Sequence, residues 1–128
     1  NNVKFTGWIN RDKIPENIAD ASIGIGPLRL TDVTSRALPI KVLEYMAVSL
    51  PIIAQKGTLP DDVLVNEKNG YFIENENELA SRIIFLLQNN EISAKMGQKS
   101  KEMVLKFDWE HITETIVKEY DSVEPNSS

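Results

Sequence analysis

The chain has 128 residues, of which 41% are hydrophobic and 26% are charged, as expected for one globular domain with a single core. It contains no cysteine and one histidine, which excludes disulfides, a cysteine nucleophile, a thiolate metal site and a multi-histidine metal site. The net charge is −5 and no basic run is present, so nucleic acid is not an expected partner, because phosphate backbones need concentrated Lys and Arg.

The first part of the chain predicts a strand, a short helix and a second strand. The segment VKFTGWI alternates apolar and polar residues, which is typical of a strand, and the pattern breaks at Gly7. In DKIPENIADA, Pro15 is compatible with the first turn of a short helix. SIGIGPL predicts the second strand, which ends at Gly26 and Pro27.

A longer helix is predicted next, after a polar loop that is rich in Ser and Thr. Thr34 or Ser35 can cap this helix, and Pro39 is tolerated in its first turn. The helix is expected to end near Val48, because Pro51 prevents its continuation.

Two further strands are predicted in PIIA and GYFI. Between them, DDVLV predicts a single helical turn, and EKNG predicts a tight turn in which Gly70 supplies a positive φ. NENELASRIIFLLQNN then predicts an amphipathic helix. Its apolar positions on one face are Leu79, Ile83, Leu86 and Leu87.

Two more helices are predicted in EISAKMGQKSKEMVLKF, which Gly97 weakens, and in DWEHITETIVKEYDSV, which Asp108 caps. Because strands and helices alternate along the chain, we expect an α/β fold with a parallel sheet flanked by helices. The expected domain covers residues 1–123, and residues 124–128 form a disordered tail.

A ligand of such a sheet is expected at the carboxyl ends of the strands. This edge would include the turn at Gly7, the loop from Pro27 to Arg36 and the loop at Gly57. The amides of the helix that begins near Ser35, together with Arg29 and Arg36, could hold a phosphate. An ordinary helix start with solvated arginines explains the same residues.

Glu44 is a carboxylate among apolar neighbours in the predicted helix. It is either a solvated surface residue that pairs with Lys41, or a cleft residue whose two oxygens accept hydrogen bonds from the hydroxyls of a ribose. Trp8 either stacks on a nucleobase or belongs to the core. Asp61 and Asp62 suggest helix capping rather than a metal pair.

Four segments, in order, resemble one family of enzymes. LPIKVLEYMAVSLPIIA is similar to the donor-binding segment of the retaining glycosyltransferases with two facing Rossmann-like domains, the GT-B fold of the glycosyl transferases group 1 family. VKFTGWINRDKIPENIADASIGIGPL, KNGYFI and FDWEHITETIVKEY resemble the family's flanking segments, so the likeness covers nearly the whole chain. The resemblance implies a Rossmann-like domain that is part of the C-terminal half of a GT-B enzyme.

The resemblance also implies roles for particular residues. Glu44 would bind the ribose of a nucleoside diphosphate sugar. Lys41, apart from the resemblance, either neutralises a phosphate or is a helix-surface lysine that pairs with Glu44. Gly7 and Trp8 would lie near the base. The amides that would contact the phosphates and the sugar belong to Ser35, Arg36, Ala37 and Leu38.

The sequence departs from the family at three points. Arg36 stands where the family often has a first glutamate that contacts the donor sugar, and Ser49 stands where a turn glycine is usual. The Arg and Lys with which relatives stabilise the leaving diphosphate belong to a β–α unit that would precede Asn1. We therefore expect no catalytic residue in this chain, a longer parent protein, and no activity of this piece alone.

The expected function of the intact protein is that of a hexosyltransferase, which moves a sugar from a nucleoside diphosphate to a glycan or lipid acceptor without metal or cofactor. The alternative is a non-catalytic α/β module that binds a nucleotide or a partner. A homodimer through an exposed sheet edge is a further expectation. The expected location is the cytoplasm, with contact to the inner face of a membrane through the N-terminal half that is expected to precede this chain. No apolar stretch reaches the roughly 20 residues that cross a bilayer.

Overall fold

The computed structural model of the chain describes residues 13, 16, 18, 20–32 and 39–106. Within the predicted short helix over residues 12–21, the described residues Glu16 and Ile18 are helical. The strand predicted at residues 3–9, the helix predicted at 108–123 and the tail lie outside the described residues, so the predicted domain bounds stay predictions.

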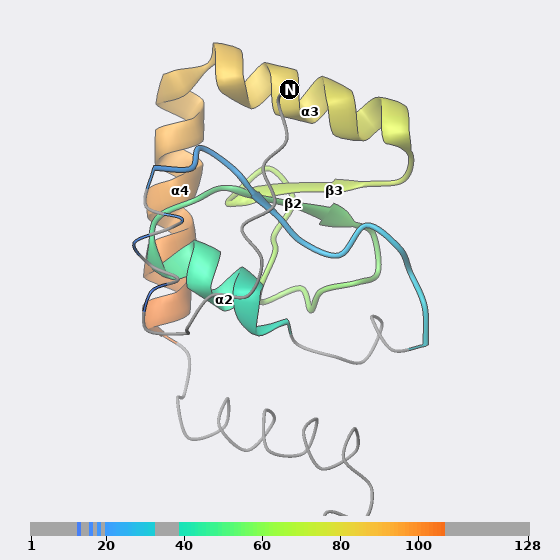
Figure 1. Cartoon of the computed structure of the whole chain (residues 1–128), viewed down its shortest axis with the longest axis horizontal. Helices are drawn as coiled ribbons and strands as arrows, with labels where there is room; N and C mark the ends of the chain where they lie inside the picture. Colours follow the sequence, from blue (N-terminus) through green and yellow to red (C-terminus); the bar gives the residue numbers. More distant parts are fainter. Residues whose placement is uncertain (1–12, 14–15, 17, 19, 33–38, 107–128) are drawn as a thin grey trace, which may run out of the picture.

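In the described part of the chain, three short parallel strands form the centre of the fold (Figure 1). They are β1 (Gly24–Ile25), β2 (Ile52–Gln55) and β3 (Gly70–Ile73), and they lie in the order β1-β2-β3. Ile52 of β2 pairs with Gly24 on one side and with Gly70 on the other. The predicted α/β fold with a parallel sheet is confirmed.

Helices cover both faces of this sheet, since α2 (Ile40–Ala47) lies on one side and α3 (Glu76–Gln88) on the other (Figure 1). Successive strand residues point to opposite faces, so Ile52 and Ala54 pack towards α2 while Ile53 packs towards α3. Helix α4 (Asn90–Leu105) runs along one end of the sheet and contacts α2 and α3. The result is two apolar cores, one on each face of the sheet.

The core on the α2 side is the larger of the two. Its buried residues are Val42, Leu43, Met46, Ile52, Ala54, Leu59, Val63, Leu64 and Val104. The core on the α3 side consists of Ile53, Tyr71, Ile73, Leu86 and Met96.

Helix α2 begins later than the sequence predicted. Pro39 is its N-cap, with an extended backbone (φ −67°, ψ 122°) and no side-chain cap, so Pro39 lies just before the helix and not in its first turn. The carbonyl of Pro39 accepts a hydrogen bond from the N–H of Val42 at 3.1 Å. Thr34 and Ser35, the predicted caps, lie outside the described residues, so their capping role stays a prediction.

The amphipathic helix α3 begins as its sequence indicates. Asn75 is the N-cap, and its Oδ1 accepts a hydrogen bond from the N–H of Glu78 at 2.9 Å. The carboxylate of Glu78 accepts the N–H of Glu74, the residue before the N-cap, at 2.9 Å, so the Glu78 side chain holds the chain just before the helix start. Leu87 is 54% exposed, which makes its predicted place on the core face wrong.

The connection from β2 to β3 crosses the α2 face without a helix. It contains the predicted single turn, in which the N–H of Leu64 bonds the carbonyl of Pro60 at 3.1 Å, and it buries Val63 and Leu64 in the core on the α2 side. The predicted positive φ of Gly70 is confirmed, at 158°, and Glu67 in the same turn also has a positive φ, of 68°. A glycine is required at position 70 because a Cβ there would lie 1.7 Å from the carbonyl oxygen of Ile52.

Part of the outer edge of β3 is already paired. The N–H of Phe72 donates to Oδ1 of Asn66 at 3.0 Å, and the N–H of Glu67 donates to the carbonyl of Gly70 at 2.8 Å. Another strand could not pair with these groups without displacing the loop. The homodimer through a sheet edge stays a prediction. Among the described residues, no helix has the length and apolar character needed to span a membrane.

Candidate functional site

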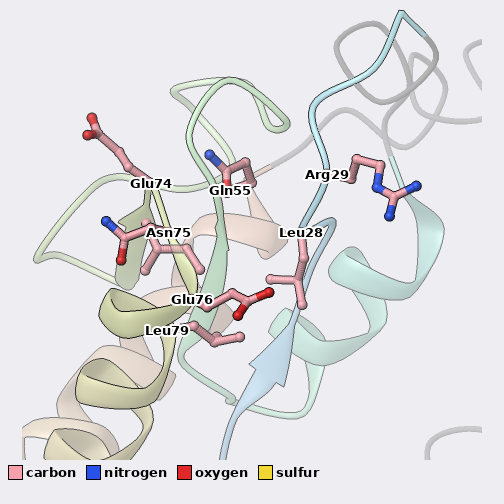
Figure 2. Close-up of a pocket in the computed structure, with 8 residues that line it drawn as sticks. Leu28, Arg29, Gln55, Glu74, Asn75, Glu76 and Leu79 are labelled. Atoms are coloured by element: carbon pink, nitrogen blue, oxygen red, sulfur yellow. The ribbon is translucent and has the colours of Figure 1, made fainter.

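The carboxyl ends of all three strands open into one hollow of about 650 Å³ (Figure 2). Its lining comes from the segment after β1, the last residues of β2 and β3, and the first turn of α3. The residues are Leu28, Arg29, Gln55, Ile73, Glu74, Asn75, Glu76 and Leu79. The volume is in the range of small-molecule sites, and the hollow lies at the edge where α/β sheets bind their ligands.

Backbone hydrogen bonds hold the three strand ends together at this hollow. The N–H of Gln55 donates to the carbonyl of Pro27, and the N–H of Lys56 donates to the carbonyl of Ile73, both at 2.8 Å. The loop after β2 is fixed by Thr58, which is buried and whose Oγ1 donates to the carbonyl of Gln55 at 2.7 Å. The edge therefore consists of residues whose backbone is held by the sheet.

The hollow has an apolar floor and a polar rim. Leu28, Ile73 and Leu79 supply the apolar surface, whereas the rim consists of carboxylate, amide and guanidinium groups. The Glu76 carboxylate points to the middle of the hollow, beside Leu28 and Leu79, while the guanidinium of Arg29 points away from it (Figure 2). Carboxylates and amides accept hydrogen bonds from hydroxyl groups, so this rim suits a hydroxyl-bearing ligand better than a bare phosphate.

One rim carboxylate is part of a surface ion pair. Nζ of Lys56 lies 3.5 Å from Oε1 of Glu74, with side chains that are 71% and 62% exposed. Water and salt screen such a pair, so it contributes little to stability. Lys56 also lies beside a second, smaller depression of about 340 Å³, which Glu74 shares.

Two of the residues that the sequence singled out lie on α2. Glu44 is half-buried and Lys41 is exposed, and neither lines the hollow. The core face of α2 consists of Val42, Leu43 and Met46, and the helical repeat of 3.6 residues puts Glu44 on the side away from these three. The structure therefore does not bring Glu44 to the hollow, and its predicted contact with a ribose stays a prediction.

The other predicted site residues lie outside the described residues. They are Gly7, Trp8, Ser35, Arg36, Ala37 and Leu38. The first N–H group of α2 with a hydrogen-bond partner in the helix start is that of Val42, which donates to the Pro39 carbonyl. The N–H groups of α2 that precede it belong to Ile40 and Lys41. The predicted cluster of phosphate-binding amides at positions 35–38 is thus neither supported nor contradicted.

Tyr45 is a residue that the sequence did not single out. It is half-buried and packs against the core on the α2 side, with its ring beside Gly24 of β1. Burial, and to a smaller degree the charge of Glu44, raises the pKa of Tyr45 above its ordinary value of 10.0. The spacing of Gly24 and Gly26 in SIGIGPL is the signal that could have identified the contact, because glycines on one face of a strand permit close packing.

The described residues offer no metal centre. Asp61 and Asp62 are exposed, and no three His, Asp or Glu side chains in the described part of the chain come together to hold an ion. The charge of the carboxyl-end hollow comes from single side chains on separate elements.

Comparisons with known proteins agree with this architecture. The family model described as glycosyl transferases group 1 matches residues 1–103. An uncharacterized glycosyltransferase of Methanocaldococcus jannaschii is 26% identical over 94% of this chain and 34% of its own length. The poly(ribitol-phosphate) α-N-acetylglucosaminyltransferase of Staphylococcus aureus is 30% identical over 63% of this chain and 16% of its own length. The chain thus spans about a third or less of these two relatives.

Two crystal structures share the fold. Staphylococcus aureus TarM, crystallised with fondaparinux, α-GlcNAc-glycerol and UDP, superposes with a TM-score of 0.64 at 24% identity, over 83% of this chain and 21% of TarM. The C-terminal domain of a glycosyl transferase group 1 protein of Francisella tularensis superposes with a TM-score of 0.62 at 22% identity, over 80% of this chain and 50% of that domain. At these identities the likeness establishes the fold.

Proposed function

Because the chain belongs to the glycosyl transferases group 1 family, we propose that it is part of the donor-binding half of a glycosyltransferase. The intact enzyme would move a hexosyl group from a nucleoside diphosphate sugar to a glycan or lipid acceptor. The observation that carries the proposal is the family match over residues 1–103. The hollow at the carboxyl ends of the strands supports it, because ligands of such sheets bind there.

The similar proteins support a nucleoside diphosphate sugar as the donor. One relative is named as an α-N-acetylglucosaminyltransferase, and one protein of the same fold was crystallised with UDP and sugars. Transfer with retained stereochemistry, without metal or cofactor, is part of the same proposal. Catalysis would depend on electrostatic stabilisation of the leaving diphosphate.

Within this chain we assign binding roles and no catalytic role. Glu44 would accept hydrogen bonds from the ribose, and Lys41 would lie near a phosphate. Gly7 and Trp8 would lie near the base. The amides of residues 35–38 would contact the diphosphate and the sugar. This chain alone would bind the donor without turning it over, because the proposal places the groups that stabilise the leaving diphosphate outside it.

The test is a titration of the ¹⁵N-labelled chain and of the intact protein with UDP, GDP and their sugars. We expect amide shifts at the start of α2, and Glu44→Gln should weaken binding about tenfold or more, since a hydrogen bond to a charged group contributes about 1.5–3 kcal/mol. Glu102→Gln is the control, because Glu102 lies on α4 in a surface pair with Lys99 at 3.5 Å. An intact protein that binds none of these nucleotides at millimolar concentration would overturn the proposal.

One observation favours the alternative of a nucleotide- or partner-binding module without turnover. Arg36 stands where the family often has its first glutamate, so recognition of the donor sugar through that residue is lost. The two functions differ in the fate of a bound nucleotide sugar. Release of free UDP or GDP from the sugar nucleotide by the intact protein would establish transfer or hydrolysis, and its complete absence with every acceptor offered would favour the module.

A further inference from the structure

Strand β1 presents a face without side chains to α2. Gly24 and Gly26 are two residues apart in an extended segment, so they lie on the same face. A Cβ added to Gly24 would lie 2.6 Å from Cδ2 of Tyr45, and one added to Gly26 would lie 3.4 Å from Cγ2 of Val42. Val42 and Tyr45 are three residues apart and share a face of α2. Helix α2 therefore contacts this segment at two adjacent points: the Tyr45 side chain packs against Gly24 of β1, and the Val42 side chain packs against Gly26, just after β1.

The Tyr45 contact is the tighter of the two. Three atoms of this side chain, Cβ, Cγ and Cδ2, lie within 2.8 Å of the position that a Cβ of residue 24 would take, so the ring rests directly on the strand backbone. Real Cβ atoms do not approach other atoms this closely, so any residue larger than glycine at position 24 would move α2 or the ring. The thickness of the Tyr45 ring thus sets the spacing between α2 and β1.

The groups of α2 to which donor binding is assigned are rigidly connected to this contact. Glu44 is the residue before Tyr45, and α2 is one regular helix from Ile40 to Ala47. A change in the height or tilt of the helix at Tyr45 would move the Glu44 carboxylate and the Lys41 side chain together. Misplacement of a binding group by about 1 Å can cost two orders of magnitude in function.

We propose that Tyr45 is a positioning residue of the donor-binding site: its ring, seated on Gly24, holds Glu44 and the first turn of α2 in register with the carboxyl edge of the sheet. This inference rests on the proposed function and deepens it. Tyr45 would act through the ring and not through its hydroxyl, because it is the ring that fills the space above Gly24.

The experiment measures the affinity of the intact protein for UDP and GDP by calorimetry, at a temperature where circular dichroism shows each variant folded. Tyr45→Ala and Tyr45→Leu should weaken binding about tenfold, whereas Tyr45→Phe should bind like the wild type. The matched control is Tyr71→Ala, since Tyr71 is a buried aromatic residue in the core on the α3 side. It should lower the melting temperature and leave the affinity within about twofold, because it lies across the sheet from α2.

A double variant tests the contact itself. Gly24→Ala alone should weaken binding, and Gly24→Ala combined with Tyr45→Ala should bind better than the product of the two single effects, because the new methyl group occupies space that the ring vacated.

The outcomes separate this inference from the function on which it rests. If the wild type binds a nucleotide but Tyr45→Ala and Tyr45→Leu bind equally well, the positioning role is overturned and the donor site stands. Equal weakening by Tyr71→Ala, or weakening by Tyr45→Phe, would also overturn it. If the wild type binds neither nucleotide, the proposed function and this inference fail together.

Discussion

Gly97 of α4 lies directly against the backbone of Ser49 at the end of α2. A Cβ added to Gly97 would lie 2.0 Å from the carbonyl oxygen of Ser49, and Gly97 is buried. Sequence reasoning treats a glycine in a helix as a weakness, because glycine gains conformational freedom on unfolding. The structure gives Gly97 a positive role, since it allows α4 to approach the turn that ends α2.

Gly97→Ala should therefore destabilise the protein although alanine is the better helix former. We expect the overpacking to cost about 1–3 kcal/mol, which exceeds the gain of about 1 kcal/mol in helix propensity. The free energy of unfolding in urea measures the difference. Gln98→Ala, at the exposed neighbouring position, should change it by less than about 0.5 kcal/mol. A stabilised Gly97→Ala variant would contradict the close approach.

Ser49→Gly should stabilise the protein. Ser49 has a φ of 63°, a conformation that costs a non-glycine residue roughly 1–2 kcal/mol. The N–H of Ser49 bonds the carbonyl of Met46 and the N–H of Leu50 bonds that of Tyr45, both at 3.1 Å, so the turn that ends α2 is closed here by a serine in a strained conformation.

The expected gain is about 0.5–1 kcal/mol in the free energy of unfolding, after the larger entropy of an unfolded glycine is subtracted. Thermal unfolding followed by circular dichroism measures it. Ser93→Gly, inside α4, is the control and should destabilise by roughly 0.5 kcal/mol, because its backbone is helical. A loss of stability in both variants would show that the φ of Ser49 carries no cost.

The order and type of the described elements could be read from local patterns. PIIA and GYFI are short apolar runs bounded by turn residues, and each is a strand. The start of α3 carries its own signal, since Asn75 and Glu78 stand three positions apart before an apolar run, and the Asn75 side chain accepts the N–H of Glu78. Such features depend on residues within a few positions of one another, so one sequence is enough to find them.

Features that depend on distant contacts could not be read in this way. Gly70 and Gly97 are required by the carbonyls of Ile52 and Ser49, which are 18 and 48 residues away in the chain. The hollow shows the same limit. The sequence named the Arg29 loop, but the contribution of Glu76 was missed, because periodicity does not reveal which helix start meets the strand ends.

Asn69→Ala should be among the most damaging single substitutions in the β2–β3 connection. Asn69 is fully buried, its Oδ1 accepts the N–H of Val65 at 2.8 Å, and its Nδ2 donates to the carbonyl of Val63 at 2.9 Å. Alanine would leave both backbone groups unpaired, at about 1–3 kcal/mol each, so we expect a loss of about 2–4 kcal/mol in urea unfolding.

The matched control for that substitution is Asn66→Ala in the same connection. Asn66 is exposed, and its side chain accepts a single hydrogen bond, from the N–H of Phe72. Its loss should cost less than about 1 kcal/mol, since water can replace the acceptor. Equal losses in the two variants would show that burial of the Asn69 amide does not govern the effect.

The free energy of unfolding should fall at alkaline pH, and this fall should be smaller in Tyr45→Phe than in the wild type. The pKa of Tyr45 is raised above 10.0, first by burial and then by Glu44, so the folded state holds the phenol proton more tightly than the unfolded chain does. The unfolded chain therefore binds fewer protons than the folded state above about pH 10, and the free energy of unfolding falls as pH rises. This contribution is fully present below pH 10 and is lost as the pH passes through the raised pKa.

Urea unfolding between pH 8 and pH 11 measures the effect. Tyr71→Phe is the control, because it keeps the Tyr45 hydroxyl and should therefore show the Tyr45 part of the decline. An identical decline in Tyr45→Phe and the wild type would show that the Tyr45 phenol is not held in its neutral form by the fold.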